Sequence, residues 1–217
     1  MHRESRARES WGTQMIEKAR RNPKQARAQA TVDAILAATF QLLEADGEGK
    51  LTTNRIAERA GVSIGTLYQY FKDRDAILTA MGERQAEALR RKVTDIVLAS
   101  PEQDGIRTIV QAIMSGIEGS PETRIVLMDA LFRAHGESIM SQHHAAFLDS
   151  IRERSDLDFV LGRESAFVLT HAVVCLLRAA ASEPELELDP TALEDELVLL
   201  IESYMGALAL RAERASA

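Results

Sequence analysis

The chain is poor in cysteine, the residue that forms the disulfide bonds of many extracellular proteins. Its 217 residues include one cysteine, Cys175, which excludes an internal disulfide and fits a reducing compartment, so we expect a cytoplasmic protein. Cys175 lies in the apolar run AVVCLL, which predicts a buried, unreactive thiol. The N-terminus is polar and charged, unlike a secretory leader, and we find no run approaching the length of a membrane span.

Catalytic and metal-binding motifs are also missing from the sequence. It has no Gly-x-Ser-x-Gly elbow, no phosphate-binding glycine loop and no Ser-His-Asp set at a recognised spacing. His143 and His144 are adjacent and would face different ways on a helix, and no His-x-x-x-His or cysteine pair accompanies them. We therefore predict no catalytic residue, metal or cofactor, and an enzyme is the least favoured function class.

What the composition does contain favours an all-α fold. Aromatic residues make up only 5% of the chain, whereas apolar residues as a whole reach 46%. A core of Leu, Ile, Val and Ala suits helices better than sheets. Five prolines and twelve glycines leave long stretches uninterrupted. The length is enough for one large helical unit or two that pack closely together.

The most informative stretch is residues 51–78, which predicts a helix-turn-helix. Thr52 and Thr53 precede a short amphipathic helix and can cap its first turn. Gly61 follows where a helix would end in the left-handed conformation. Ser63 can then cap a second helix, Ile64 to Tyr70. We interpret this second helix as the one that enters a DNA major groove.

The side chains on the outer face of the second helix support this interpretation. They are hydroxyls and an amide, which can donate to and accept from base edges and phosphates, and they belong to Ser63, Thr66, Tyr68, Gln69 and Tyr70. Gly65 would let the backbone approach DNA closely, and Lys72 and Arg74 could hold flanking phosphates. The alternative is that Tyr68 and Tyr70 are simply core aromatics, the role expected for Phe71.

The run LTTNRIAERAGVSIGTLYQYF, followed by KDRDAIL, resembles the signature of the TetR family of transcriptional regulators over residues 27–80. The resemblance implies an all-helical dimer with a DNA-binding head and a ligand-binding body, in which an effector separates the heads and releases DNA. Carried over by position, it implies DNA contacts at Thr53, Asn54, Ile64, Gly65, Thr66, Tyr68, Gln69, Tyr70 and Lys72. Ile64 is apolar where some members have a polar residue, so its contact would be to a thymine methyl.

Charge is divided unevenly along the chain, although the net charge is −7. Residues 1–74 contain 13 Lys and Arg against 9 Asp and Glu, a balance of +4. Residues 75–217 contain 13 against 24, a balance of −11. The positive part coincides with the helix-turn-helix, so the field of the protein would orient it head first on DNA.

We expect three parts: a basic N-terminal arm (1–26), a DNA-binding domain (27–74) and a helical regulatory and dimerisation domain (75–217). The arm either adds phosphate or minor-groove contacts or is a tail without a role. Comparing the salt dependence of DNA binding with and without residues 1–22 would decide between these alternatives. A first helix over 27–46 closes the three-helix head, and the basic residues Lys24 and Arg27 near its start could reach phosphate.

Asp73 can cap a long fourth helix that reaches about Ala99 and joins head to body. Further helices are predicted in the body at about 106–117, 125–132, 139–151, 163–182 and 191–214. The last two are apolar around much of their circumference, so one stripe needs a cover beyond the core. A symmetric four-helix contact in a homodimer would supply it and would place two heads on a pseudo-palindromic operator.

The resemblance also implies a small-molecule pocket in the body. The candidates combine polar or aromatic groups with apolar faces, and they are Met114, Met128, Phe132, Arg133, His135, His144, Phe147 and His171. Each also has a core or surface interpretation. The sequence therefore predicts a repressor released by an effector, with an activator or partner-controlled regulator that binds no small molecule as the alternative.

Overall fold

The computed structural model describes residues 23–99, 105–136, 138, 141, 144–145, 147–149 and 161–216. The rest of the expected arm and most of the helix expected at 139–151 lie outside these residues. The described part is helical, without β-strands, in the order α2 (Pro23–Asp46), η1 (Glu48–Lys50), α3 (Thr53–Ala60), α4 (Ile64–Tyr70), α5 (Arg74–Ala99), α6 (Gly105–Met114), α7 (Pro121–His135), α10 (Arg163–Ser182), η2 (Pro184–Leu186) and α11 (Pro190–Ser216). The all-α prediction is confirmed.

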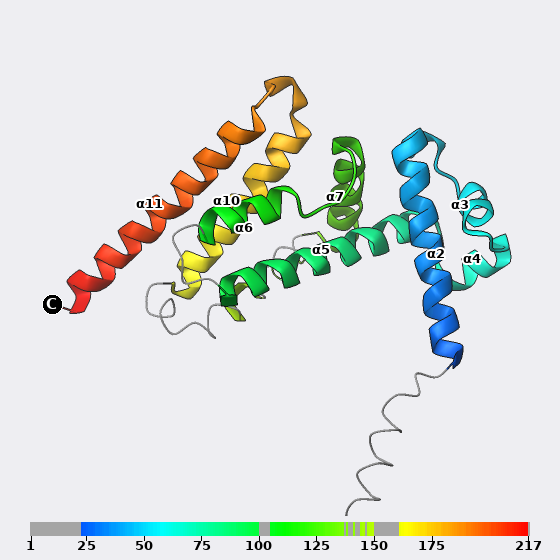
Figure 1. The fold of residues 1–217 in the computed structure, drawn as a ribbon, viewed down its shortest axis with the longest axis horizontal. Helices are drawn as coiled ribbons and strands as arrows, with labels where there is room; N and C mark the ends of the chain where they lie inside the picture. The colour runs from blue at the N-terminus through cyan, green and yellow to red at the C-terminus, as the bar shows by residue number, and fades with distance from the viewer. Residues whose placement is uncertain are drawn as a thin grey trace, which may run out of the picture.

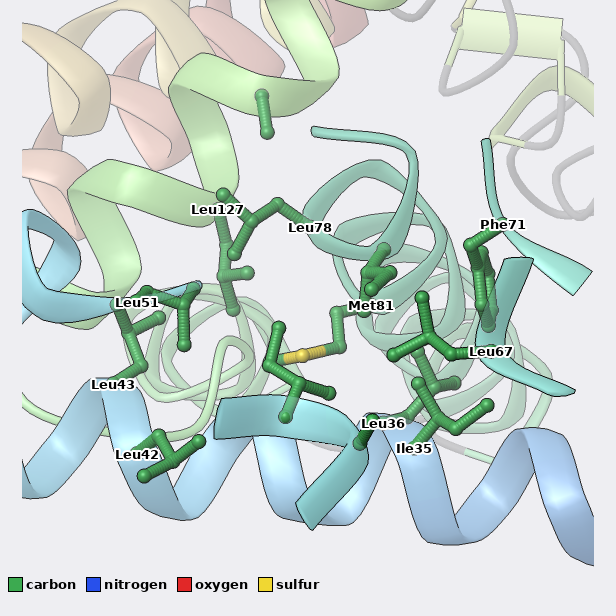
Figure 2. Packing of buried hydrophobic residues seen from close by; sticks show 14 residues of the cluster. Ile35, Leu36, Leu42, Leu43, Leu51, Leu67, Phe71, Leu78, Met81 and Leu127 are labelled. Atoms are coloured by element: carbon green, nitrogen blue, oxygen red, sulfur yellow. The ribbon is translucent and has the colours of Figure 1, made fainter. Parts of the chain in front are cut away.

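The helices α2, α3 and α4 form a head at one end of the molecule, and α5 leads from it towards α10 and α11 (Figure 1). Helix α2 begins at Pro23 rather than at residue 27, because proline is well suited to the first turn, where its missing N–H needs no partner. The head is held by fully buried side chains from each of its helices, including Ile35, Ile56 and Leu67. Figure 2 shows this cluster from close by.

The core of the head includes residues of the body. Leu127 and Ala130 of α7 belong to the same buried cluster as Leu78 and Met81 of α5, and Leu127 lies beside Leu78 (Figure 2). Close packing of α5 and α7 depends on Gly82, where an added Cβ would lie 2.7 Å from Leu131 Cγ. The hydrophobic core therefore continues across residue 74, where the sequence suggested a boundary between two domains.

A polar contact also joins the first helix of the head to the start of α7. The Ser120 N–H donates to Glu44 Oε1 at 2.9 Å, and Ser120 Oγ caps α7 by accepting from the Thr123 N–H at 3.2 Å. Hydrogen bonding from Thr123 and then from the Ser120 backbone lowers the pKa of Glu44 below its ordinary value of 4.5. The negative carboxylate also interacts favourably with the positive N-terminal end of the α7 dipole.

The contribution of Glu44 to stability is expected to depend on pH. Because the pKa of Glu44 is lower in the folded chain, its stabilising effect is present above pH 4.5 and is lost as the pH falls through the folded value. Glu44→Gln keeps an acceptor for Ser120 but removes the charge. Urea unfolding between about pH 3 and 7 should show a shallower acid loss for this variant, whereas Glu58→Gln, at an exposed position of α3, should keep the parental slope.

The body packs α6 against α5 and α11, with Val110, Leu197 and Val198 buried between α6 and α11. Helix α6 ends at Met114, before the position expected, and Gly116 lies so close to α5 that an added Cβ would meet Leu89 Cδ1 at 2.4 Å. Arg107 Nη1 bridges α6 to α11 through Glu194 at 2.7 Å. These contacts fix α11 at the end of the molecule opposite the head (Figure 1).

Two expectations about α10 are wrong. Its length and mean hydropathy of 1.6 match those of a membrane-spanning helix, although no comparable run was expected from the sequence. Cys175 is exposed rather than buried. Val173 of the same helix is 5% exposed, and two residues later the helix has turned by about 200°, so Cys175 faces outward. An apolar run predicts burial on all sides only when neighbours surround the helix.

Candidate nucleic-acid interface and effector cavity

The turn between α3 and α4 has the predicted geometry. Thr52 Oγ accepts from the Arg55 N–H at 3.3 Å and caps α3. Gly61 ends the helix with φ 68° and ψ 28°, a left-handed conformation that glycine adopts readily. Ser63 Oγ accepts from the Thr66 N–H at 3.0 Å and starts α4. Local capping therefore sets where each of the two helices begins.

Helix α4 is anchored by one face and presents the other to solvent. Leu67 is fully buried and Phe71 is 8% exposed, whereas Tyr68 is 52% and Tyr70 38% exposed. Gln69 is exposed as well. The interpretation of Tyr68 and Tyr70 as core aromatics is therefore wrong, and their side chains are available to a partner.

Hydroxyl groups converge on this exposed face. Tyr68 Oη lies 3.2 Å from Thr53 Oγ1 at the start of α3, and Ser63 Oγ lies 2.8 Å from Thr66 Oγ1. Around Gly65, the nearest atom to an added Cβ would be Ser63 Oγ at 3.8 Å, so packing within the chain does not require glycine there. A close approach by something outside the chain would require it.

The basic residues near α4 differ in their availability. The Lys72 side chain is 83% exposed and 3.9 Å from Asp73. Arg74 instead contacts Glu48 at 3.3 Å and Asp75 at 3.2 Å, so it helps to join η1 to α5. The other predicted positions, which are Asn54, Ile64, Lys24 and Arg27, are exposed. The last two lie in the first turns of α2, whose end projects beyond α4 (Figure 1).

Arg55 has a structural role that the sequence did not reveal. It contacts Asp46 at 2.5 Å and donates to the Lys50 carbonyl at 2.9 Å. The hydrogen bond from Arg55 lowers the pKa of Asp46. Arg55 thereby links the end of α2 and η1 to α3.

The body contains a cavity of about 390 Å³ formed by α5, α6, α7, α10 and the connection to α11. Its interior is apolar, with Leu89, Ile113 and Met128 among the lining residues. One face of α7 supplies much of the wall, and the neighbouring face carries Leu127 in the core of the head. A single helix therefore contacts both the cavity and the head.

Three of the predicted pocket residues, Met114, Met128 and Phe132, line this cavity. The other five lie elsewhere. Arg133 is exposed on α7, and His135 Nε2 contacts Glu83 Oε1 at 2.7 Å. His144 and His171 cluster with Phe167, whose ring is stacked on that of His171 with centroids 3.9 Å apart. Phe147 packs against a separate cluster of α10 and α11.

Five charged residues of the cavity were missed in the sequence, and they are Arg124, Asp129, Arg178, Glu183 and Glu187. Two of them could have been found, because Arg124 and Asp129 share a helix face with Met128 and Phe132. The residues of α10 and the loop come from distant sequence, so no local pattern places them there. Among the residues that the structure describes, no group of three His, Cys, Asp or Glu side chains is arranged to hold a metal ion.

Comparison with known proteins gives matches to the head and to the fold. Residues 35–81 match the model of bacterial regulatory proteins of the tetR family. An uncharacterised HTH-type transcriptional regulator of Xanthobacter autotrophicus is 38% identical over 55 residues, covering 25% of this chain and 27% of that protein. One of Mycobacterium tuberculosis is 36% identical over 75 residues, covering 33% and 37%. The matches thus span about a quarter to over a third of these relatives.

The resemblance in fold covers most of the chain. The crystal structure of the TetR family repressor AlkX from Dietzia sp., implicated in biodegradation of n-alkanes, matches with a TM-score of 0.54 at 22% identity. The match covers 82% of this chain and 97% of that one. The head of this chain, at residues 35–81, thus matches the tetR family of bacterial regulatory proteins in sequence, and the chain as a whole shares the fold of solved TetR-family structures.

Proposed function

We propose that the protein is a transcriptional regulator that binds DNA through α4 and acts as a repressor released by a small molecule. The observation that carries the proposal is the division of α4 between a buried anchor, Leu67, and an exposed face of hydroxyl and amide groups. That face suits base edges and phosphates in a major groove. The other proposed contacts, including Asn54, Ile64 and Lys72, surround it on the same head, and we propose a cytoplasmic location.

A homodimer through α10 and α11 is part of the proposal. Both helices expose large apolar side chains, namely Phe167, Val168, Leu176, Leu199, Leu200 and Leu210. A symmetric contact between two copies would cover them and present two heads to one duplex. The operator would then be an inverted repeat with half-sites one or more helical turns apart.

The effector would bind in the body cavity and act through α7. Because α7 carries Met128 towards the cavity and Leu127 towards the head, a shift of this helix would be transmitted to α5 and the head. The effector releases DNA if it binds more tightly to the conformation whose heads are wrongly spaced for DNA than to the conformation that binds DNA. A regulator without a small-molecule ligand, the alternative, would have no need of such a cavity.

Selection of bound DNA from a random pool tests the DNA-binding part of the proposal. The expected result is an inverted repeat bound by two chains, which would give half-site, spacing and stoichiometry together. Recovery of no enriched sequence, or of a single half-site bound by one chain, would contradict the proposal.

Thr66→Ala and Tyr68→Ala are each expected to weaken binding to the selected DNA by about 1–3 kcal/mol, because each removes groove-facing polar contacts. Both side chains are outside the core, so the circular dichroism spectrum and dimer mass should not change. Binding titrations measure the effect, and Glu58→Ala on the exposed side of α3 is the control. Parental affinity in both variants would show that α4 does not read the groove.

A further inference from the structure

The charges around the body cavity limit the chemical class of its ligand. Two positive and three negative side chains line it. Arg178 lies over the Phe132 ring at 3.9 Å from the centroid and 3.8 Å from Asp129 Oδ1. Arg124 donates from Nε to the Gly119 carbonyl at 2.9 Å, and its charge also acts on Glu44. Both arginines therefore already interact with groups of the chain itself.

The acidic residues Glu183 and Glu187 line the cavity from the connection between α10 and α11. Both are exposed, and neither has an ion pair or hydrogen bond from its carboxylate within the described residues. Residues 183–190, EPELELDP, contain four acidic residues and no basic one. The unbalanced charge at this edge of the cavity is therefore negative.

Much of the lining of the same cavity is apolar. Leu89, Ile113, Ile117 and Leu177 line it, and burying a hydrocarbon chain against such side chains is favourable in proportion to the area covered. Residues 75–217 carry a balance of −11, so the wider field also attracts cations and repels anions. A ligand that is apolar along its length and positive at one end would complement the apolar lining, the acidic edge and the acidic surroundings.

We propose that the effector of this cavity is a lipophilic cation, with its hydrocarbon part between α5, α6 and α7 and its positive group beside Glu183 and Glu187. This deepens the proposed function and rests on it for the link to DNA release. A positive group could also approach the Phe132 ring and Asp129, which Arg178 now occupies. A long-chain carboxylate would instead meet two unpaired carboxylates at the edge.

Calorimetric titration of the DNA-free protein with decyltrimethylammonium, decanoate and decanol tests the proposal, because the three share one chain length. The cation should bind about tenfold more tightly than the other two. Glu183→Gln combined with Glu187→Gln should weaken its binding about three- to tenfold. Glu185→Gln is the matched control, since Glu185 is in the same loop but does not line the cavity, and it should leave the affinity unchanged.

The Arg178→Gln variant distinguishes most clearly between a cationic and an anionic ligand. It should maintain or strengthen binding of the cation, because it frees Phe132 and Asp129, whereas a carboxylate ligand would lose its partner. Equal binding of all three probes, no binding of any, or preferential binding of decanoate that Arg178→Gln abolishes would overturn the proposal. DNA release is measured separately on the selected operator. Cation binding without release would leave the ligand class standing and contradict the effector-controlled repressor.

Discussion

Replacing Leu199 by glutamate is expected to convert the proposed dimer into a monomer and to weaken operator binding by about 100- to 10,000-fold, the range over which two linked binding sites exceed one. Leu199 and Leu210 of α11 are 57% and 56% exposed in the single chain. They lie eleven residues apart, about three helical turns, and therefore on one face. A glutamate at this face would place two unpaired carboxylates in the symmetric contact, where burial without a partner is costly.

The folded monomer should tolerate this change, because exposed positions usually alter stability by no more than about 0.5 kcal/mol. Leu186→Glu is the matched control: Leu186 is 54% exposed but belongs to η2, outside the two apolar helix faces. Light scattering gives the mass, and titration of full and half operators gives the affinity. If Leu199→Glu stayed dimeric with parental affinity, the copies would have to meet through another surface.

The head could be predicted almost completely from the sequence because its structure is determined locally. The caps Thr52 and Ser63 lie three residues from the N–H groups that they bind, and Gly61 supplies the left-handed turn without help from distant residues. The spacing of apolar residues then identifies Leu67 as the anchor. The ion pair between Arg55 and Asp46 was not apparent, because either residue alone resembles ordinary surface charge, and neither was the contact of Arg74 with Glu48.

The body could be predicted as a set of helices but not as an arrangement of them. Helix α10 has the predicted bounds, 163–182, yet its periodicity does not tell which apolar face is covered within the chain, and so Cys175 was misplaced. The cavity depends on how α7, α10 and the loop before α11 meet, which involves residues far apart in sequence. The chemical type of the side chains suggested the candidates, whereas the packing of these helices determines which residues line the cavity.

Leu127→Ala is expected to lower the free energy of unfolding by about 3–5 kcal/mol, which is among the larger effects available to one substitution. Leu127 is 0% exposed and belongs to the buried cluster of the head. Removing its isobutyl group leaves a cavity between α7, α5 and the head, and the long helices around it can close only partly. Leu127→Met, which nearly conserves volume, should cost less than about 1.5 kcal/mol.

The same substitution tests whether head and body unfold together. If residues 27–74 and 75–217 had independent cores, Leu127→Ala would destabilise the body and leave the unfolding of the head unchanged. Because Leu127 lies in the cluster that includes Ile35 and Leu67, we expect one cooperative transition to shift as a whole. Urea unfolding followed by Trp introduced at Phe71 and, separately, at Phe132 reports on the two parts. If the two transitions coincide and shift together, α7 and the head share one cooperative core, through which a shift of α7 can reach α4. Separate transitions would mean that the proposed effector acts on the head by another route.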